Sequence, residues 1–454
     1  MRIVIIGAGE IGFRVAQRLS TENKDVVIID KNPDAIKRIN DHLDVQTILG
    51  SGSSPVLLEQ AGLQKAELFL AVTDSDETNL TACLFARALA PNITKLARIR
   101  NQEYMHFKSA LTREIVNIAH VINPDQEVVH SLERMVEVPG ALEVNQFAAG
   151  RVSLVGVRVC PESPLLGIRL MDVPERYRDD RFIVAALIRG EKLVIPTGKD
   201  DIHEEDIIYF ICESEQVNNV MPLFNPCTKK IRQIMIIGGG SVGLLAARRL
   251  EKKGLSVKLV DMDLERCRFL AGELDQTVVL HGDGSEVDLL QEENIQDMDA
   301  LLALTSSEET NILISLLAKS LGVDKTITRI NKFTYVPLAR AIGLENVISQ
   351  RIAAVSTILR HVRRGKVISS VPIKGEEAEA LEAVALENSS IVNKPIKDLH
   401  FPKGALILCV IRGEDVHIPT GETIILPQDR IIILSTRRTI ERVERSLAVK
   451  LKYF

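Results

Sequence analysis

Short apolar runs alternate with helical patterns over the first 125 residues of the chain. Five runs rich in Ile, Val and Leu are predicted to be strands: Ile3–Ile6, Val26–Asp30, Val45–Leu49, Leu68–Val72 and Leu96–Arg100. The stretches between them repeat apolar residues at helical spacing and are predicted to be helices, at 11–20, 34–41, 54–61, 77–90 and 102–112. This alternation predicts βαβ units, and hence an α/β domain with a doubly wound parallel sheet.

The next segment has a different pattern, in which short strands follow one another closely. Strands are predicted at Arg151–Val159, Phe182–Ile188, Lys192–Ile195 and Asp206–Cys212, with helical patches near 164–172 and 214–224. Because a tight turn separates two of these strands, we expect antiparallel pairing. The segment is therefore predicted to be a small α+β domain of about 80 residues.

Both patterns occur twice in the chain. Ile5–Gly12 returns as Ile236–Gly243, and the string Ile-Pro-Thr-Gly at 195–198 returns at 418–421. Landmarks that recur in the same order indicate an internal tandem duplication. Domain boundaries are expected near 125–140, 226–232 and 350–370. The predicted plan has two doubly wound domains, each followed by a small α+β domain, at 1–125, 140–226, 231–350 and 368–454.

The composition is that of a globular protein of 454 residues, with 46% hydrophobic and 26% charged side chains. Aromatic residues make up only 4% and Trp is absent, so the cores must be built from Ile, Val, Leu and Ala. The net charge of −5 argues against a nucleic-acid partner. No apolar run approaches the ~20 residues of a transmembrane helix, so we expect any membrane role to be peripheral.

The cysteines and histidines show no spacing typical of a metal site. Six cysteines are scattered without a Cys-x-x-Cys pair: Cys83, Cys160, Cys212, Cys227, Cys267 and Cys409. This usage favours a reducing cytosol and predicts neither a metal site nor a disulfide framework. No catalytic His, Tyr-Lys or Cys arrangement is recognisable, so no catalytic residue is predicted.

Each doubly wound domain opens with a glycine-rich turn. Gly7, Gly9 and Gly12 follow an apolar strand, open a helix and precede Asp30 by 18 positions or more. The same spacing recurs at Gly238, Gly240, Gly243 and Asp261. In this context the pattern is a dinucleotide-binding fingerprint, because the glycines allow a tight turn, approach of a pyrophosphate and close helix packing. The alternative is a degenerate fold that needs the glycines only for its turn.

Asp30 and Asp261 end the second strand of their domains, where a carboxylate can accept hydrogen bonds from both ribose hydroxyls. A carboxylate there favours NAD or an adenosine nucleotide over NADP, whose phosphate it would repel. Alternatively, each aspartate caps the following helix. Asn32 and Asp263 are better placed for that task.

Arg98 and Arg100 lie two positions apart near the end of a predicted central strand, so we expect them on the same side. A bound phosphate is one natural partner, and a neighbouring carboxylate is the alternative. In the second copy the pair is Arg329 and Asn331. We therefore expect the first site to suit a multiply charged phosphate better than the second.

Two further pairs follow the fourth strand of each doubly wound domain, Thr73-Asp74 and Thr305-Ser306. They could contact a ribose or a phosphate. They could equally be turn residues that lead into the next helix, and the sequence leaves both interpretations open.

The repeated strings resemble the RCK/KTN family of potassium-conductance regulators, and within it the fused two-unit cytosolic subunits of bacterial Trk-type uptake systems. The most specific motifs are the glycine fingerprints, Ile-Pro-Thr-Gly, Asp76-Glu77-Thr78-Asn79, Glu308-Glu309-Thr310-Asn311 and Ala97-Arg98-Ile99-Arg100. The resemblance covers essentially the whole chain. It implies Rossmann-like RCK N-terminal domains and small RCK C-terminal domains.

The resemblance also implies a function without a pore of its own. A homotetrameric ring of eight RCK units would sit on the cytoplasmic face of a TrkH-like membrane subunit, bind NAD(H) and ATP or ADP, and gate potassium flow. The implied nucleotide contacts in the first unit are Gly7, Ala8, Gly9, Glu10, Ile11, Asp30, Thr73, Asp74 and Arg98. In the second unit they are Gly238, Gly239, Gly240, Ser241, Val242, Asp261, Thr305, Ser306 and Arg329.

The chain departs from the family pattern at one position. The family commonly has Gly-Asp after the third strand, as at Gly282-Asp283, whereas the first unit has Gly50-Ser51. An adenosine-side contact is therefore expected from Asp283 but is in doubt at the first site. The competing function is an NAD-dependent oxidoreductase with duplicated Rossmann domains, which would need a substrate domain with an acid–base residue.

Overall fold

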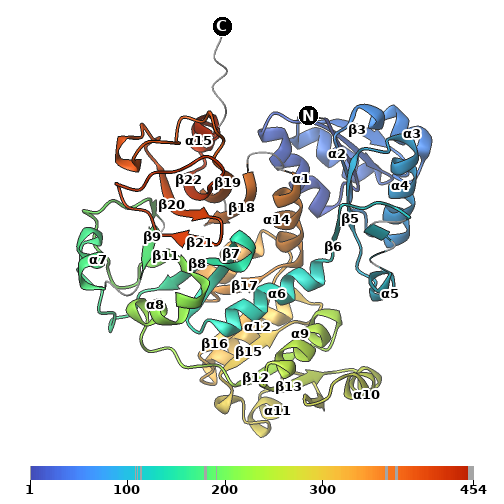
Figure 1. Cartoon of the computed structure of the whole chain (residues 1–454). Coiled ribbons are helices and arrows are strands. Elements are labelled where there is room, and N and C mark those ends of the chain that lie inside the picture. The colour runs from blue at the N-terminus through green and yellow to red at the C-terminus, as the bar shows by residue number, and fades with distance from the viewer. Residues whose placement is uncertain are drawn as a thin grey trace. The chain divides into compact units, whose positions relative to one another are not determined.

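The computed structural model describes residues 2–107, 109, 111–112, 115–177, 181–190, 192–362, 367–373 and 377–447 (Figure 1). Of the helix expected over 102–112, positions 108 and 110 lie outside the described residues. The same holds for the last seven positions of the fourth expected domain. Within the described part of the chain, no helix is long and apolar enough to cross a membrane.

The first doubly wound domain is a six-stranded parallel sheet with helices between its strands. Its elements are β1 (Arg2–Ile6), α1 (Glu10–Thr21), β2 (Asp25–Asp30), α2 (Pro33–His42), β3 (Gln46–Leu49), α3 (Pro55–Gln60), β4 (Leu68–Ala71), α4 (Asp76–Leu89), β5 (Thr94–Arg98), α5 (Gln102–His106) and β6 (His120–Ile122). The strand order is β3-β2-β1-β4-β5-β6, which is the Rossmann order. The order reverses between β1 and β4, and ligands of open α/β sheets bind at the carboxyl end of such a reversal.

The second doubly wound domain repeats this topology. Its elements are β12 (Gln233–Ile237), α9 (Ser241–Lys252), β13 (Ser256–Asp261), α10 (Leu264–Glu273), β14 (Val278–His281), α11 (Val287–Glu292), β15 (Ala300–Ala303), α12 (Glu308–Ser320), β16 (Lys325–Arg329), α13 (Tyr335–Ala341) and β17 (Asn346–Ile348). The strand order is β14-β13-β12-β15-β16-β17. The central strands β12 and β15 contribute buried Ile, Leu, Met and Ala to the core, as the shortage of aromatic residues requires. The prediction of two Rossmann-like domains is confirmed.

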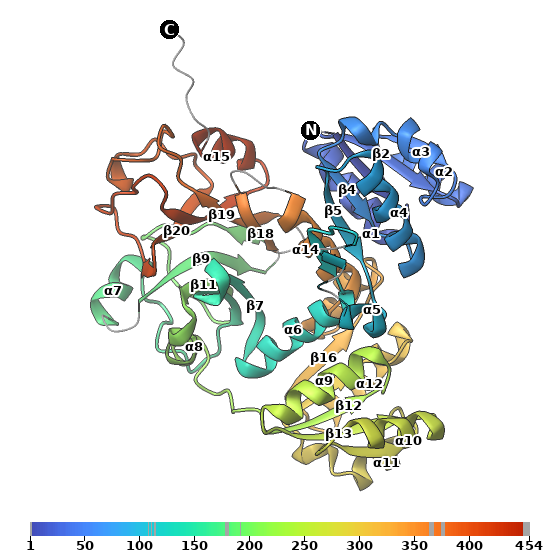
Figure 2. The ribbon, with the colours of Figure 1, turned by 45° about the vertical axis from the view of Figure 1, so that its right-hand side comes forward.

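Each small domain is a five-stranded antiparallel sheet. The first contains β7 (Ala141–Phe147), β8 (Val152–Arg158), α7 (Val173–Arg176), β9 (Phe182–Arg189), β10 (Lys192–Val194), β11 (Ile207–Glu213) and α8 (Val217–Phe224). The second contains β18 (Val367–Ile373), β19 (Ala378–Val384), β20 (Ala405–Arg412), β21 (Asp415–His417), β22 (Arg430–Thr436) and α15 (Ile440–Leu447). Figure 2 shows the two sheets side by side. They share one apolar core, in which Leu154 and Ile211 pack with Leu408 and Ile432.

Two segments that the sequence marked as domain boundaries are helices. The expected boundary at 125–140 is occupied by α6 (Pro124–Glu137), and β7, a strand that was not predicted, begins directly after it at Ala141. The expected boundary at 350–370 contains α14 (Gln350–Val362). The sequence analysis assigned no secondary structure to these two segments, and the structure shows that they are helices.

The two helices pack on the domain of the other half. One compact unit comprises residues 1–130, 330–333 and 348–362, so α14 of the second half belongs with the first doubly wound domain. There Ala354, Ile358 and Val362 are buried with Val15 and Leu19 of α1, and Figure 1 shows α14 beside α1. The exchange explains why α14 carries apolar residues that its own half does not cover.

The second compact unit comprises residues 131–329, 334–347 and 363–454, and it contains the end of α6 from the first half. Arg249 of α9 forms an ion pair with Glu133 of α6, at 2.7 Å. The buried Lys325 of β16 donates to the carbonyl oxygens of Met135, at 2.6 Å, and Ala141, at 3.2 Å. A cation thus closes the carboxyl end of α6, where free carbonyl groups favour positive charge.

Candidate nucleotide-binding sites

The glycine-rich turn joins β1 to α1, and its three glycines have different surroundings. Gly7 has φ +101°, and a Cβ there would lie 2.9 Å from the Thr73 nitrogen. A Cβ on Gly12 would lie 1.8 Å from the Gly7 oxygen. A Cβ on Gly9 would meet no atom of the described residues within 4 Å. Turn geometry and packing therefore account for Gly7 and Gly12, whereas Gly9 leaves space beside the backbone that the fold does not use.

The second turn, between β12 and α9, repeats this arrangement. Gly238 has φ +105°, and a Cβ on Gly243 would lie 1.9 Å from the Gly238 oxygen. Around Gly240 the described part of the chain again leaves 4 Å of open space. The space beside the middle glycine is a feature of both copies.

Several side chains between the glycines are buried in the core. Ala8, Ile11 and Val242 are buried, so a ligand could reach them only through the backbone. The first α-helical bond of α1 runs from the Phe13 nitrogen to the Gly9 oxygen, at 2.8 Å. The N–H groups of Glu10, Ile11 and Gly12 come before this bond and have no partner within the helix, which is the feature that lets a helix N-terminus bind an anion.

Asp30 holds the first glycine turn through its backbone. One carboxylate oxygen accepts from the Ala8 nitrogen at 2.5 Å, and the other accepts from the Asn32 nitrogen at 2.8 Å. The cap of α2 is provided by Asn32, whose side chain accepts from the Asp34 nitrogen. Asp30 is therefore a residue of the turn and does not cap α2.

Asp261 has the same place in the second copy. It accepts from the Gly239 nitrogen at 2.6 Å and from the Asp263 nitrogen at 2.9 Å. Asp263 caps α10. Both carboxylates thus lie against their glycine turns, at the carboxyl end of β2 and of β13.

The guanidinium groups of Arg98 and Arg100 meet at one carboxylate-bearing turn. β5 ends at Arg98, so Arg100 lies beyond the strand that was expected to contain it. Arg98 donates to Asp74 Oδ1 at 2.9 Å, and Arg100 donates to the Asp74 carbonyl at 3.0 Å. The Arg98 side chain is 12% exposed, whereas that of Asp74 is 96% exposed. Asp74 is the neighbouring carboxylate of the alternative interpretation, yet the buried Arg98 Nε has no hydrogen-bond partner in the described structure.

Thr73 is bound internally by a buried asparagine. Asn79 accepts from the Thr73 hydroxyl at 2.7 Å and donates to the Arg98 carbonyl at 2.9 Å. In the second copy Asn311 makes the same bonds to Thr305 and to the Arg329 carbonyl. The threonines are therefore turn residues in this structure. The asparagines that fix them were visible in the sequence as repeated Glu-Thr-Asn strings.

Arg329 and Asp283 complete the second copy. Arg329 donates to the carbonyls of Leu304 and Thr305, both at 3.2 Å. Asp283 accepts from the backbone and the hydroxyl of Ser285, and these bonds lower its pKa. In the first copy Ser51 forms the corresponding bond to Ser53, at 2.9 Å. The turn is thus kept without the acidic side chain.

One cation in each copy was not predicted. Arg38 of α2 donates to the Ala8 carbonyl at 3.1 Å and forms an ion pair with Glu10. Arg266 of α10 donates to the Gly239 carbonyl at 2.6 Å. The repeat could not reveal them, because Arg266 corresponds in position to Ala35. Residues 35 and 38 lie on one helix face, so each side chain reaches the same turn.

The charges at the two sites are closer than the arginine count suggested. The first site has Arg100 where the second has Asn331, but it also has two carboxylates, Glu10 and Asp74. The second site has Ser241 and Ser306 at those positions. Both serines remove a negative charge, so the arginine count alone does not favour the first site for a multiply charged phosphate.

Comparison with known protein families follows the duplication. The TrkA-N domain model matches residues 3–124 and 234–350, and the TrkA-C domain model matches residues 154–225 and 381–448. The chain belongs to the TrkA family. Relatives named Trk system potassium uptake protein TrkA agree over the whole length. The one from Halomonas elongata is 36% identical over 100% of both chains, and that from Vibrio alginolyticus is 36% identical over 98% of both.

Solved structures show the same fold for this TrkA family chain. The GsuK RCK domain matches with a TM-score of 0.61 at 18% identity, covering 98% of this chain and 94% of that one. The GsuK channel bound to NAD matches with a TM-score of 0.61 at 18% identity, covering 98% and 78%. The likeness at this identity is one of fold, and it confirms the predicted RCK architecture.

Proposed function

We propose that this chain is the nucleotide-binding regulatory subunit of a Trk-type potassium-uptake system. It binds NAD(H) and ATP or ADP and couples their binding to opening of a TrkH-like membrane subunit. Its relatives are named as potassium-uptake proteins, and one protein of similar fold is a channel bound to NAD. The proposal places the chain on the cytoplasmic face of the inner membrane, as a homotetrameric ring of eight RCK units.

The observation that carries the proposal is the space beside Gly9 and Gly240. The fold leaves it open in both copies, next to a helix N-terminus, and a carboxylate is bonded to each turn. A dinucleotide needs these elements together, because its pyrophosphate must approach the backbone while its ribose meets the carboxylate.

Each residue would have a separate task. Asp30 and Asp261 would accept from the ribose hydroxyls, and the first-turn N–H groups of α1 and α9 would bind the phosphates. Arg98 would contribute a guanidinium that already lies at the carboxyl edge of the sheet. A phosphate there would replace Asp74, which is exposed and can turn away. Asp283 would lie on the adenosine side of the second site.

Nucleotide binding would act on the gate through differential affinity. A nucleotide shifts an equilibrium between open and closed rings only by the difference of its affinities for them. By linkage, the membrane subunit must change nucleotide affinity in return. A tenfold difference per site is worth ~1.4 kcal/mol, so several sites acting together would move the gate decisively.

Calorimetric titration with NADH, ATP and ADP tests the sites one at a time. We expect Asp30→Ala and Asp261→Ala each to remove or weaken binding at one site. Asp41→Ala is the matched control, because Asp41 is an exposed carboxylate near the far end of α2. Unchanged titrations in both site variants would reject the assignment. The affinities of the single-site variants for ATP also decide whether either site prefers the more highly charged nucleotide.

Two functional assays separate regulation from catalysis. Potassium flux through vesicles that hold the membrane subunit should depend on nucleotide with the wild-type chain and lose that dependence with the double variant. NADH supplied with alcohols, aldehydes and hydroxy acids should remain unoxidised. Steady oxidation of NADH would instead support the oxidoreductase function.

A further inference from the structure

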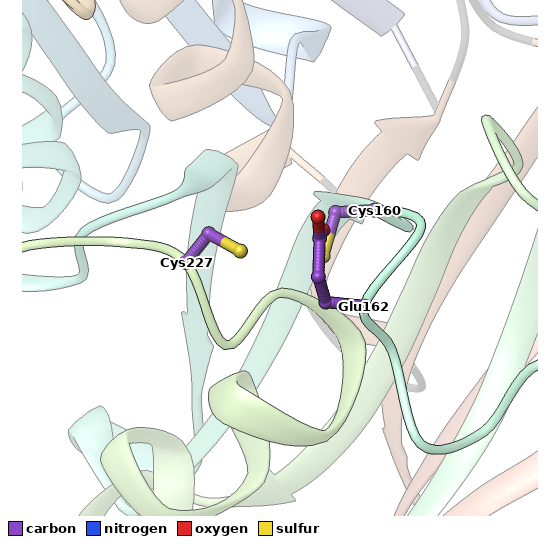
Figure 3. A group of neighbouring side chains, drawn as sticks. All are labelled: Cys160, Glu162 and Cys227. Carbon is purple, nitrogen blue, oxygen red and sulfur yellow. The ribbon is translucent and has the colours of Figure 1, made fainter.

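Two cysteines and a glutamate converge beside the first small domain, although the cysteines are far apart in the sequence. Cys160 and Glu162 lie in the turn after β8, and Cys227 lies in the segment after α8. Their Sγ atoms and one Glu162 carboxylate oxygen lie within 4.8 Å of one another. Figure 3 shows the Cys227 side chain pointing toward the other two.

Backbone hydrogen bonds hold the two segments together independently of these side chains. The Cys160 nitrogen donates to the Phe224 oxygen at 3.2 Å. The buried Ser163 donates from its hydroxyl to the Leu223 oxygen at 2.7 Å and from its nitrogen to the Cys160 oxygen at 3.1 Å. The turn is therefore fixed to the end of α8, and the ligand atoms are brought together by the fold.

These two cysteines differ from the other four. All six are free thiols, but Cys83, Cys212, Cys267 and Cys409 are buried, whereas Cys160 is half-buried and Cys227 is exposed. Burial raises the pKa of Cys83, Cys212 and Cys409 to about 12. A metal ion must approach the sulfur atom from solvent, so the converging pair is the pair that an ion can reach.

The second small domain builds the same turn without the cluster. The Ser389 nitrogen donates to the Leu386 oxygen at 3.0 Å, as Ser163 does to Cys160, and Ser389 is likewise buried. Leu386 and Asn388 therefore stand where the first domain has Cys160 and Glu162. The fold of this turn does not require sulfur or a carboxylate, so their presence in the first copy needs another reason.

The carboxylate already serves both thiols. Hydrogen bonds from Cys160 and Cys227 lower the pKa of Glu162, and the bond to Glu162 raises the pKa of Cys227 to about 11. A divalent cation bound among these three groups would take the place of the two thiol protons.

We propose that Cys160, Glu162 and Cys227 form a binding site for one divalent cation of the Zn²⁺ class. Two thiolates and a carboxylate are a donor set that suits Zn²⁺. Tetrahedral bonds of about 2.3 Å to sulfur and 2.1 Å to oxygen place ligand atoms ~3.6–3.8 Å apart, so the three side chains need to close by at most about 1 Å. Binding releases the two thiol protons, and a water completes the fourth position.

The site would connect the first small domain to the segment that leads into the second doubly wound domain. Cys227 belongs to that segment, while Cys160 and Glu162 belong to the turn after β8. A bound cation would therefore restrain residues 225–228 directly. This inference is independent of nucleotide binding and contradicts the absence of a metal site that cysteine spacing predicted.

The test uses the full chain, Zn²⁺ in competition with a chromophoric chelator, and Co²⁺ absorption, both under reducing conditions. We expect one ion per chain and a thiolate-to-cobalt charge-transfer band. Cys227→Ser should weaken binding by more than about a hundredfold, beyond the loss typical of an outer-shell change. The double variant Cys160→Leu/Glu162→Asn copies the second domain's turn, so it should fold normally and lose the band. Cys267→Ser is the control and should bind as the wild type does.

Three results would overturn the proposal. Binding that survives in Cys227→Ser would place the ion elsewhere. Failure of the wild type to compete with the chelator would remove the site. A mass lower by two hydrogens after exposure to air, together with no metal binding under reducing conditions, would show that the two cysteines form a disulfide. Protection of residues 225–228 from hydrogen exchange should rise on Zn²⁺ addition, and an unchanged rate would refute the restraint of that segment.

Discussion

Adding one methyl group to Gly9 or to Gly12 separates ligand binding from folding. Gly9 has φ −62° and an open surrounding, so Gly9→Ala should change the free energy of unfolding by less than about 0.5 kcal/mol. Gly12→Ala places a Cβ 1.8 Å from the Gly7 oxygen, so α1 and the turn must separate by about an ångström. Overpacking of this kind costs about 2–4 kcal/mol.

Gly9→Ala should lower nucleotide affinity even though it leaves stability almost unchanged. The methyl of Gly9→Ala stands where a pyrophosphate must approach the backbone, and loss of one charge-assisted hydrogen bond costs ~1.5–3 kcal/mol. We therefore expect affinity at the first site to fall about tenfold to a hundredfold in a protein that melts like the wild type. Calorimetry with NADH and ATP, together with thermal unfolding, measures both quantities. Wild-type affinity in Gly9→Ala would refute the assigned approach of the ligand, and wild-type stability in Gly12→Ala would refute the packing argument.

Three further predictions concern the framework. Burial lowers the pKa of Lys325 to about 8, so the unfolded chain binds the proton more tightly than the folded chain does. The free energy of unfolding should therefore rise between about pH 8 and 10.5, by at most ~3 kcal/mol. Denaturation midpoints measured across this range should show the rise in the wild type and not in Lys325→Met. Asp206→Ala removes a carboxylate, 1% exposed, that accepts two hydrogen bonds from Arg189, and should lower the free energy of unfolding by about 2–3 kcal/mol, whereas an unaffected denaturation curve would count against this pair. Asn79→Ala should lower the free energy of unfolding by about 2 kcal/mol and weaken nucleotide binding at the first site, which denaturation and titration would measure. Unchanged binding would mean that the position of Thr73 does not matter for the ligand.

The parts of the fold that depend on local pattern were predictable. The strands of both sheets follow from short apolar runs, and the glycine turns follow from residue type and spacing. α6 and α14 were not predicted as helices, and the structure shows that apolar residues of α14, such as Ile358, pack on the other half of the chain. The pattern of apolar residues within one half does not show which segment of the other half will cover them.

The sites divide in the same way. Asp30 and Arg98 could be named from the sequence, because a fingerprint fixes the first and a strand end fixes the second. Arg38 could not be named from the sequence. Residues three positions apart on a helix reach the same turn, so Arg38 and Arg266 do not occupy matching positions of the repeat. The meeting of Cys160 with Cys227 depends on the packing of α8 against β8, which spacing along the chain does not encode.

The exchange of α6 and α14 has a consequence for how the two copies can change. Two separate polypeptides that completed each other in this way would come apart on dilution, and identical ones would have to carry every substitution twice. Covalent fusion keeps the partner at a high effective concentration whatever the amount of protein. Each copy is then free to vary alone, as Ser51 against Asp283 and Cys160 against Leu386 illustrate. The two halves of one chain can therefore take different functional roles.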